Sequence, residues 1–462
     1  MKVALVNLPH REPMMRRYVA SYHAPNFLLP PMELMGLGAI VREWKGGEAV
    51  LIDAMAERLS CRDVVDRLRP FEPDLLVTMT GFYIFGDDMA ALAEVAQGLP
   101  NTRIACFGYF PTMFPREVCE QGPADIVFTD EPELAFSETY DRLAAGQSPA
   151  GVAGVAFRED GAVTVNPRRP RITDLDSLPF PDHSLVNLDL YNESFLDRPI
   201  AMVMTSRGCP MPCIYCVRTF GRQLALRSAE NVLEEIAGLV HGHGIRNIRF
   251  MDDTLAVSRD RAERIFTGLI ERGLDINWTC LTRLDTLDAD LLALMRRSGC
   301  RRMYLGIESG SQRVLDRLRK RLTVDQVERQ VRLVRRAGIE ASAFFIVGSP
   351  GETESDLGRS IALAKRLDVD YIIVTQIQAW PGTDLWEQWK DRVRFSLFPF
   401  RLEWDERRDL AAWERRFYRE FYLRPSYILR RLRDFRAARS DLLLGAGKLL
   451  AYLLRRETHD FI

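Results

Sequence analysis

The sequence predicts an α/β protein with a doubly wound parallel sheet at its N-terminus, a partial (β/α)6 barrel and a helical C-terminal tail. Three observations support this fold class. Strand-like apolar segments alternate with amphipathic segments in the N-terminal third, the same alternation resumes near residue 200, and an Arg-rich, aromatic composition begins near residue 395. Strands that alternate with helices are typical of parallel sheets. The expected regions are a first sheet, a hairpin with a linker, a barrel and a tail, with bounds 1–146, 147–195, 196–392 and 393–462.

Short apolar segments form the expected strands of the first sheet. They cover residues 3–7, 49–53, 75–80, 103–108 and 125–129. Helical patterns follow them at residues 32–43, 62–68, 88–99, 116–121 and 133–145. Sheets of this kind bind ligands at the carboxyl ends of their strands.

The second region begins with a predicted hairpin. Alternating segments 152–157 and 162–165 flank Asp160 and Gly161, and an Asp-Gly pair in that position indicates a tight turn. Residues 171–190 are rich in Pro and Asp and predict an extended connector.

Six further βα units predict the barrel. Their strands cover residues 201–205, 246–251, 277–281, 303–306, 341–347 and 371–375. Barrels of parallel strands carry their chemistry on the loops that follow the strands. We therefore expect the functional residues of this region just after those segments.

Composition limits the class of protein. The chain has 462 residues, 47% of them hydrophobic and 27% charged, and a net charge of −1, so no global electrostatic argument favours nucleic acid. The first seven residues predict a strand and not a signal peptide, and no apolar run reaches the ~18 residues of a membrane span. We expect a cytoplasmic protein.

The run Cys209-Pro-Met-Pro-Cys213-Ile-Tyr-Cys216 directly follows the first expected barrel strand. Three thiolates at this spacing can hold three irons of a 4Fe–4S cluster and leave the fourth iron open. A zinc site is the first alternative, but zinc prefers four closed ligands and no histidine lies nearby. A disulfide with a spare thiol suits a secreted protein, which this chain does not resemble. The other five cysteines are scattered and predict small core residues: Cys61, Cys106, Cys119, Cys280 and Cys300.

Together with motifs elsewhere in the chain, this run resembles the cobalamin-binding-domain radical S-adenosylmethionine (SAM) family. That family includes the class B radical SAM methylases and the anaerobic magnesium-protoporphyrin ester cyclase. The resemblance covers about residues 1–430, with a Rossmann-like first domain. The other supporting motifs lie at residues 30–38, 52–54, 107–112, 130–133, 251–254, 282–283, 306–310, 348–353 and 381–383.

The resemblance implies that the open iron takes the amino and carboxylate groups of SAM, which is cleaved reductively to a 5′-deoxyadenosyl radical. Tyr215 stands at the aromatic position that usually precedes the last cysteine. Glu308 would accept the ribose hydroxyls, or form a surface salt bridge instead. Arg283 would bind the SAM carboxylate, or pair with Asp252 or Asp285.

Two further positions have an open interpretation. Asp252 either faces the active site or only organises the barrel mouth. Gly348 either lets the backbone approach the adenine or belongs to a plain tight turn.

The resemblance also implies cobalamin in the first domain. No Asp-x-His-x-x-Gly motif is present, and Phe110 stands where the family often has His, so cobalt would have no protein ligand from that motif. The expected contacts to the nucleotide tail are small or hydroxyl residues at strand ends: Thr78, Thr80, Gly81, Gly108 and Thr112. The alternative is a vestigial domain that only shapes the substrate cavity.

The expected activity is hydrogen abstraction from an unactivated carbon, with cobalamin-dependent C-methylation as the leading hypothesis. Radical cyclisation, rearrangement or oxidation is the second hypothesis, and a tRNA methylthiotransferase or a non-catalytic iron–sulfur module are further ones. The expected partners are a small-molecule or lipid substrate and a reductant such as flavodoxin or ferredoxin, with no nucleic acid. The apolar segment 442–454 predicts either a helix docked on its own protein or an interfacial helix at a membrane.

Overall fold

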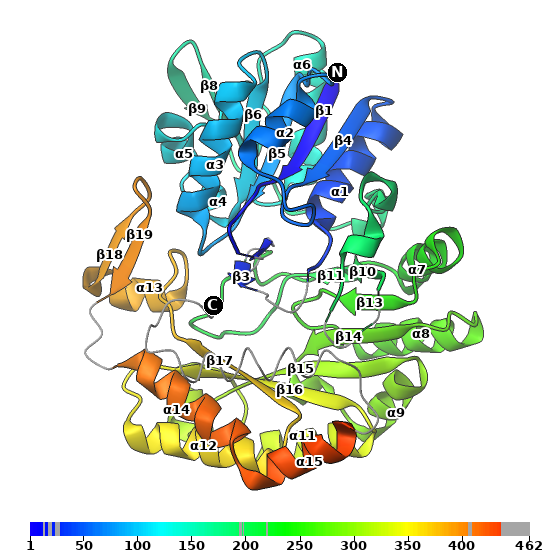
Figure 1. Ribbon diagram of the computed structural model, residues 1–462, viewed down its shortest axis with the longest axis vertical. Helices are drawn as coiled ribbons and strands as arrows, with labels where there is room; N and C mark the ends of the chain where they lie inside the picture. The colour runs from blue at the N-terminus through cyan, green and yellow to red at the C-terminus, as the bar shows by residue number, and fades with distance from the viewer. Residues whose placement is uncertain are drawn as a thin grey trace.

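The computed structural model describes residues 1–435 apart from 13, 17–20, 24–27, 194, 195, 197, 219 and 405–408. Figure 1 shows two α/β units, one above the other, joined by a linker and by the C-terminal part of the chain. The predicted fold class is confirmed, since each unit has its own sheet of mainly parallel strands.

The first sheet has seven strands in the order β4-β1-β5-β6-β7-β8-β9. The first five are parallel, and the last two add an antiparallel hairpin to β7. The bounds are β1 (Lys2–Asn7), β4 (Glu48–Asp53), β5 (Leu75–Thr80), β6 (Arg103–Gly108), β7 (Ile126–Phe128), β8 (Val155–Glu159) and β9 (Ala162–Val165). The hairpin that we assigned to the linker region is therefore part of the first sheet.

Helices cover both faces of this sheet, as a doubly wound fold requires. Val64 and Leu92 are buried on one face, whereas Leu37 and Phe136 are buried on the other. The helices are α1 (Met32–Ala39), which continues as the π-helix η1 (Ile40–Trp44), α2 (Cys61–Leu68), α3 (Phe85–Gly98), α4 (Tyr109–Met113), α5 (Pro115–Gln121) and α6 (Pro132–Ala144). The sequence did not predict α4, because its five residues are too few for a helical period.

The second sheet has six parallel strands in sequence order, β10-β13-β14-β15-β16-β17. Their bounds are β10 (Ile200–Val203), β13 (Asn247–Phe250), β14 (Asn277–Thr282), β15 (Cys300–Glu308), β16 (Glu340–Val347) and β17 (Tyr371–Gln376). The helices outside it are α7 (Ala229–His243), α8 (Arg259–Glu271), α9 (Ala289–Arg297), α10 (Gln312–Arg317), α11 (Val324–Arg336), α12 (Glu354–Leu367) and α13 (Asp384–Trp389). Local sequence sets these helices: Thr323 and Gln326 form a capping box, and α11 buries Val327, Val331 and Val334 on one face.

Short elements complete the described chain. They are β2 (Met14–Arg16), β3 (Ser21–His23), β11 (Ser206–Arg207) and β12 (Ala225–Leu226), with 3-10 turns η2 (Leu175–Ser177), η3 (His183–Leu185), η4 (Leu188–Leu190), η5 (Leu284–Thr286) and η6 (Lys390–Arg392). The linker touches both units. Tyr191 donates a hydrogen bond to Asp53 at the end of β4 (2.9 Å), while Glu193 accepts one from Arg249 inside the second sheet (2.7 Å).

The C-terminal region does not begin as a helix, contrary to the prediction. It begins with the hairpin β18 (Val393–Ser396) and β19 (Arg401–Trp404), followed by α14 (Leu410–Tyr422) and α15 (Pro425–Phe435). The hairpin lies beside the first unit in Figure 1, with the Phe110 and Phe400 rings 5.1 Å apart. The segment that forms this hairpin is short and rich in aromatic residues. Its apolar pattern is compatible with a hairpin as well as with a helix, which explains the error.

Helix α14 closes the edge of the second sheet. The hydroxyls of Tyr418 and Tyr422 accept hydrogen bonds from the backbone of Val374 and Ile372 in β17 (2.9 and 3.0 Å). These side chains satisfy donors that an exposed edge strand would leave open. Segment 442–454 lies outside the described residues, and within the described part no helix is long and apolar enough to cross a bilayer.

Candidate active site

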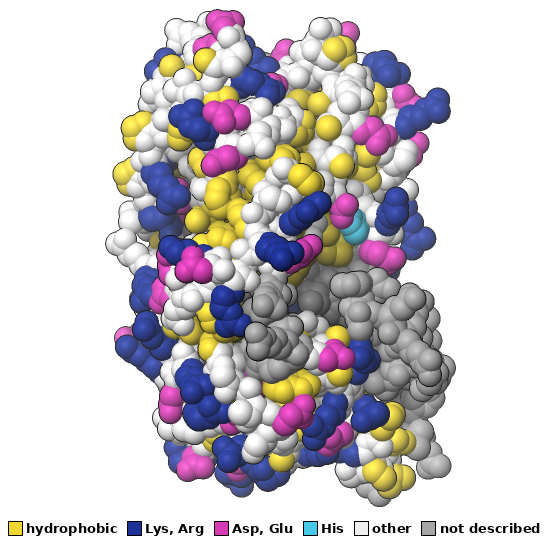
Figure 2. All heavy atoms as spheres, turned by 90° about the vertical axis from the view of Figure 1, so that its left-hand side faces the viewer, with side chains coloured by type: hydrophobic (Ala, Val, Ile, Leu, Met, Phe, Trp, Pro, Cys, Tyr) yellow, Lys and Arg dark blue, Asp and Glu magenta, His cyan; other side chains and the backbone are white. Residues whose placement is uncertain are grey.

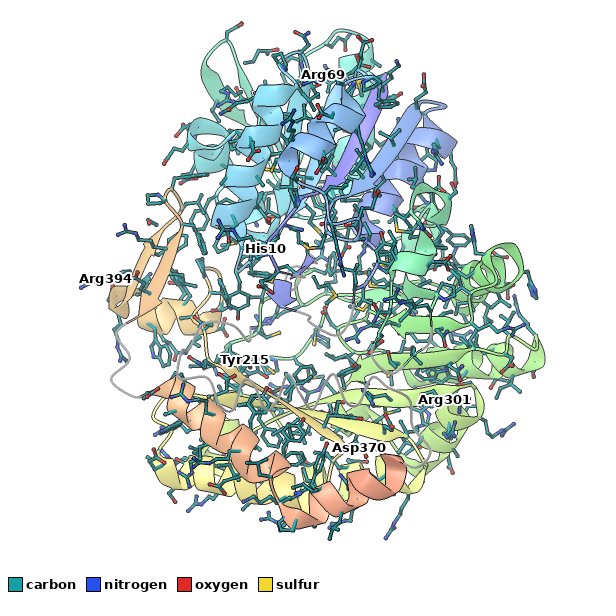
Figure 3. The ribbon with its side chains drawn as sticks, viewed as in Figure 1. His10, Arg69, Tyr215, Arg301, Asp370 and Arg394 are labelled. Atoms are coloured by element: carbon teal, nitrogen blue, oxygen red, sulfur yellow. The ribbon has the colours of Figure 1, made fainter. Side chains whose placement is uncertain are left out.

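The cysteine loop follows β10 at the carboxyl edge of the second sheet, on the side of the first unit. Figure 3 places its Tyr215 between the two units. The antiparallel pair β11–β12 closes the base of the loop. Gly208 has a φ of +87°, and a Cβ there would lie 2.2 Å from the Gln223 carbonyl oxygen. Only glycine therefore fits where these two backbone segments approach each other.

Asp252 holds the start of the loop. Its carboxylate accepts hydrogen bonds from the Thr205 amide (3.1 Å), the Thr205 hydroxyl (2.8 Å) and the Ser206 hydroxyl (2.5 Å). The side chain is buried, and its acceptors are used by the loop. Of the two interpretations of Asp252, this geometry favours the one in which it organises the barrel mouth.

Backbone contacts fix the rest of the loop. The Cys209 amide donates to the Gly221 carbonyl (3.1 Å), and the Ile214 amide donates to the Leu318 carbonyl (3.2 Å). Ile214 itself accepts from the Leu385 amide (2.9 Å). The chain between the second and third cysteines is thus tied to the segments that follow β15 and β17.

The three cysteines are free thiols with increasing exposure. Cys213 is buried, Cys209 is half-buried and Cys216 is exposed. Burial raises the pKa of the half-buried Cys209. The loop thus carries three free thiols, of which Cys216 is the most exposed.

This donor set fits an iron–sulfur cluster. Three thiolates of like charge in one loop repel one another, and bound irons remove that repulsion. No three His, Cys, Asp or Glu side chains in the described part of the chain converge on a point that suits a single ion. Three thiolates in one loop are the ligand set that holds three irons of a 4Fe–4S cluster.

Beside the loop lies a buried ion pair between Lys320 and Glu308. The Nζ–Oε1 distance is 2.6 Å, and each side chain is only 7% exposed. Glu308 has a φ of +71°, a strained conformation for a residue with a side chain. Burial first, and then the Glu308 carboxylate as acceptor, raise the pKa of Tyr215. Tyr215, Glu308 and Lys320 therefore form one polar group beside Cys213 and Cys216.

Lys320 was not identified from the sequence. It follows Glu308 by twelve positions, in the run Arg317-Leu-Arg-Lys-Arg321. Four of these five residues are basic, so the sequence does not indicate which of them is buried. A Cβ at Gly306 would lie 2.8 Å from Lys320 Nζ and 2.7 Å from Glu308 Oε1. The glycine that precedes Ile307 and Glu308 is the signal that could have indicated a close polar neighbour.

Two expected SAM contacts are engaged elsewhere. Arg283 binds Asp285 through Nε (2.9 Å) and Nη2 (2.8 Å), which is one of the two alternatives left open for it. Burial alone would lower the pKa of Arg283, but the Asp285 carboxylate outweighs it and raises that pKa. Gly348 has a φ of +90°, and a Cβ there would meet Leu410 at 2.5 Å. Helix α14 thus occupies the approach that we expected for the adenine.

The carboxyl edge of the first sheet has a different character. The residues expected to hold a nucleotide tail are all buried: Thr78, Thr80, Gly81, Gly108 and Thr112. The Gly81 amide donates to Asp88 (2.7 Å), and the Thr112 hydroxyl accepts from the Asp130 amide (2.9 Å). A Cβ at Gly108 would lie 2.7 Å from the Thr80 carbonyl oxygen. These five residues contact the chain's own atoms, so as they stand they do not fit the expected role.

A buried polar network covers the neighbouring strand ends. Arg16 binds both oxygens of Asp88 with side chains that are 1% and 0% exposed. Asn7 accepts from Arg16 (3.0 Å) and donates to Asp53 (2.8 Å). Burial raises the pKa of Asp88, and Arg16 offsets part of that effect.

Aromatic side chains fill the space next to this network. Phe82 lies 4.4 Å from Tyr109 and 5.2 Å from Trp380, measured between ring centroids. The Tyr109 hydroxyl donates to the Pro381 carbonyl, which joins the loop after β6 to the segment after β17. Burial, followed by the Cys216 thiol, raises the pKa of Tyr109, so this ring also lies near the cysteine loop.

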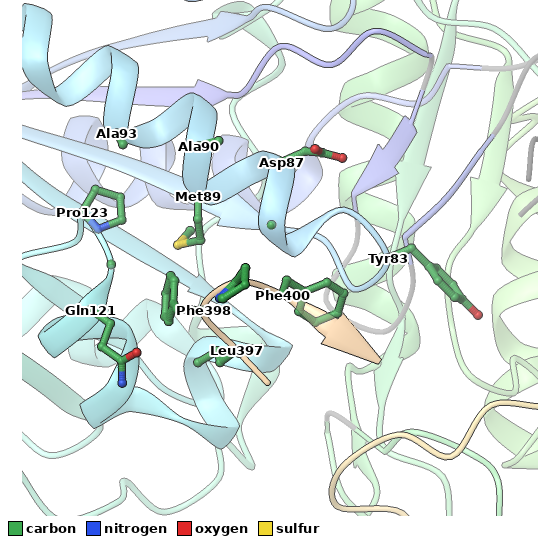
Figure 4. A pocket seen from close by; sticks show the side chains of 13 residues that line it. Tyr83, Asp87, Met89, Ala90, Ala93, Gln121, Pro123, Leu397, Phe398 and Phe400 are labelled. Atoms are coloured by element: carbon green, nitrogen blue, oxygen red, sulfur yellow. The ribbon is translucent and has the colours of Figure 1, made fainter. Parts of the chain in front are cut away.

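A cavity of about 740 Å³ lies away from the cysteines, between α3 and the β18–β19 connection. Figure 4 shows Phe398 and Phe400 beside Met89 and Ala90 of α3. Figure 2, which views this side of the molecule, shows hydrophobic side chains gathered over the first unit. None of the three loop cysteines lines this cavity, so it is separate from the polar group at the second sheet.

Comparisons with known proteins agree with the geometry of the loop. Residues 203–364 match the radical SAM superfamily. An uncharacterized methyltransferase of Pyrococcus horikoshii is 32% identical over 93% of this chain and 94% of its own length. An anaerobic magnesium-protoporphyrin IX monomethyl ester cyclase of Cereibacter sphaeroides is 28% identical over 74% of this chain, and the match spans only 57% of that protein.

The fold also has a solved counterpart. The radical S-adenosylmethionine methyltransferase TsrM from Kitasatospora setae, solved with cobalamin and a [4Fe-4S] cluster bound, superimposes with a TM-score of 0.67. The match covers 83% of this chain and 73% of TsrM at 18% identity. At that identity the likeness concerns the fold alone.

Proposed function

This chain belongs to the radical SAM superfamily, and we propose that it cleaves SAM reductively in order to methylate an unactivated carbon of a small molecule. The observation that carries the proposal is the cysteine loop at the carboxyl edge of the second sheet, with the Glu308–Lys320 pair beside it. The names of the archaeal relative and of TsrM support methyl transfer as the reaction class.

Three side chains would hold the cluster: Cys209, Cys213 and Cys216. A cluster held there would supply the one-electron reduction of bound SAM, which would provide a 5′-deoxyadenosyl radical for hydrogen abstraction from the substrate. Asp252 and the β11–β12 pair keep the loop in place, so the three sulfurs are presented in a fixed arrangement. Preorganisation of this kind lowers the cost of binding the metal group.

The polar group beside the loop would bind SAM. Glu308 binds Lys320 through one oxygen, and its carboxylate would accept the ribose hydroxyls. Lys320 balances the charge of that carboxylate in a buried setting. Burial, and then the Glu308 carboxylate, raise the pKa of Tyr215, which lies next to this pair.

Cobalamin is proposed as the carrier of the methyl group. Its support is the fold shared with TsrM, whose structure contains it. Among the five residues expected to contact its nucleotide tail, Gly81 bonds to Asp88 and Gly108 packs against Thr80. We therefore derive no step through cobalamin and assign it no residue.

A second candidate is a radical cyclisation without methyl transfer. The cyclase of Cereibacter sphaeroides favours it, with 28% identity over 74% of this chain. The same loop and the same polar group would serve both reactions, because both begin with hydrogen abstraction. The two candidates differ only in the fate of the substrate radical.

The test is reconstitution of the cluster under anaerobic conditions, followed by reduction with dithionite in the presence of SAM. We expect 5′-deoxyadenosine to form, together with corrin absorption bands in protein produced with cobalamin supplied. Label from methyl-labelled SAM should then appear in the product of the true substrate. Iron-loaded protein that neither binds nor cleaves SAM would contradict the proposal, and cleavage without label transfer would favour the cyclisation.

A further inference from the structure

Five consecutive residues on the far side of the cysteine loop form an exposed basic turn, Arg317-Leu-Arg-Lys-Arg321. Arg317, Arg319 and Arg321 are exposed, whereas Leu318 and Lys320 are buried. Arg319 and Arg321 have positive φ values of 51° and 57°. The turn therefore points two side chains into the protein and three guanidinium groups into solvent.

The buried residues connect this surface to the cysteines. Leu318 packs in the same apolar cluster as Ile214, and its carbonyl accepts the Ile214 amide at 3.2 Å. Ile214 stands between Cys213 and Tyr215 in the loop. Lys320, the other buried residue of the turn, binds Glu308 at 2.6 Å. One backbone hydrogen bond and one apolar contact thus join the turn to the cysteine loop.

Arginines outnumber carboxylates in the ion pairs around the turn. Arg319 and Arg222 approach the same carboxylate, that of Asp384, at 3.6 Å each, so two cations share one anion. Arg222 belongs to the segment that returns from the cysteine loop to β12. Arg317 is directed to a neutral acceptor, the Pro350 carbonyl (2.9 Å). The chain as a whole has a net charge of only −1, so this positive patch is local and not a general property of the surface.

We propose that the basic turn, with Arg222 beside it, is the docking surface for an acidic one-electron carrier protein of the flavodoxin or ferredoxin class. The inference rests on the proposed function and names its electron-donating partner surface. Each reductive cleavage of SAM needs one electron from outside: the carrier is oxidised by one electron and the cluster is reduced by one. A patch that combines positive charge with a direct backbone hydrogen bond to the cysteine loop suits such a partner, because complementary charge steers a transient complex.

A binding experiment tests the surface without relying on the cluster. The cluster-free protein is titrated with a bacterial flavodoxin at low and at high ionic strength. We expect binding that weakens as salt increases, and a loss of about tenfold or more in affinity at low salt for the triple variant R317E/R319E/R321E. The matched control R62E/R69E/R103E reverses three exposed arginines of the first unit, where Figure 3 labels Arg69 at the far end of the molecule. It should bind within about twofold of the wild type.

A rate experiment with the loaded enzyme gives a second readout. The triple variant should form 5′-deoxyadenosine about tenfold more slowly than the wild type with reduced flavodoxin, and at the wild-type rate with reduced methyl viologen. The neutral variant R317Q/R319Q/R321Q should lie between the two. Equal flavodoxin affinity in wild type and triple variant, an equal loss in the control triple, or an equal slowing with methyl viologen would each overturn the proposal. A wild type that does not cleave SAM with methyl viologen would overturn the proposed function instead, and the binding data would still decide the docking surface.

Discussion

The carboxyl edges of the two sheets meet in this protein, and they carry different side chains. Beyond the second sheet lie an exposed thiol, Cys216, and a strained carboxylate, Glu308. Beyond the first sheet lie Arg16 and Asp88, which satisfy each other out of contact with solvent. The linker bridges the two, because its Tyr191 reaches Asp53 at the first edge.

Topology alone treats the two edges alike. Ligands bind at the carboxyl ends of parallel strands in open sheets and in barrels. The difference lies in which side chains the edge presents. Gly81 and Thr112 at the first edge are buried and bonded within that unit, whereas at the second edge Cys216 is exposed and Glu308 forms a buried ion pair with Lys320. The comparison teaches that an edge becomes a candidate site through the chemistry of its side chains and not through its position alone.

The largest effect should come from the thiols of the second edge. Cys213→Ala removes one of three cluster ligands, so we expect 5′-deoxyadenosine formation to fall by about a thousandfold or more, to background. Iron content should fall below the roughly four atoms per chain of the wild type. Cys61→Ala is the matched control, because Cys61 begins helix α2 in the first unit and should keep both iron and activity. If Cys213→Ala kept its activity, the cysteines of the second edge would be no more important for the reaction than Cys61 in the first unit, and the proposed difference between the two edges would be wrong.

The first edge should respond in stability and not in chemistry. Asp88→Asn leaves Arg16 buried without its counter-charge, and we expect the free energy of unfolding to fall by about 3–5 kcal/mol. Asp141→Asn removes an ion pair with Lys45 in which the carboxylate is 62% exposed, and it should cost less than about 1 kcal/mol. Denaturant titration measures both variants. A small loss for Asp88→Asn would mean that the polar network at the first edge is open to water.

The contrast between the edges also decides what the sequence could predict. Strand positions and the cysteine loop follow from apolar periodicity and from ligand spacing, which are local properties. The partner of Glu308 depends on how a turn twelve residues later folds back, and four basic residues within five positions give no local reason to choose Lys320. The aromatic packing at the first edge includes Trp380, which contacts Phe82. Trp380 belongs to the other unit and comes 298 residues after Phe82. Long-range contacts of this kind are not recorded in any local pattern.

The polar group at the second edge should show a smaller effect than its thiols. Glu308→Gln removes the charge that Lys320 balances and weakens the acceptor for the ribose hydroxyls. Hydrogen bonds to charged groups contribute about 1.5–3 kcal/mol, so kcat/KM for SAM cleavage should fall about 10- to 100-fold, mainly through a higher KM. Lys320→Arg keeps the charge and should retain more activity than Lys320→Met. Glu387→Gln, an exposed partner of Lys390, is the control and should be neutral. An unchanged KM in Glu308→Gln would remove this pair from the SAM site.

The smallest effect concerns the linker that joins the two edges. His183 is buried, its ring centroid lies 5.8 Å from that of His243, and neither ring nitrogen has a hydrogen-bond partner among the described residues. Burial first, and then His243, lower the pKa of His183 from 6.5 to about 4, with Asp182 acting in the opposite direction. The unfolded chain therefore binds a proton between pH 6.5 and about 4 that the folded chain does not, and stability falls as the pH falls through this window.

At pH 5.5 the loss from His183 should be about 1.4 kcal/mol relative to neutral pH, because one pKa unit corresponds to about that free energy. His183→Leu removes the titrating group, so its unfolding free energy should depend less on pH between 7.5 and 5.5 by this amount. His241→Gln changes an exposed histidine of α7 and should leave the pH dependence as in the wild type. Chemical denaturation at the two pH values measures all three proteins. Parallel pH profiles for the wild type and His183→Leu would show that His183 is not shielded from water in the folded chain, and the linker would then not be a buried junction between the two edges.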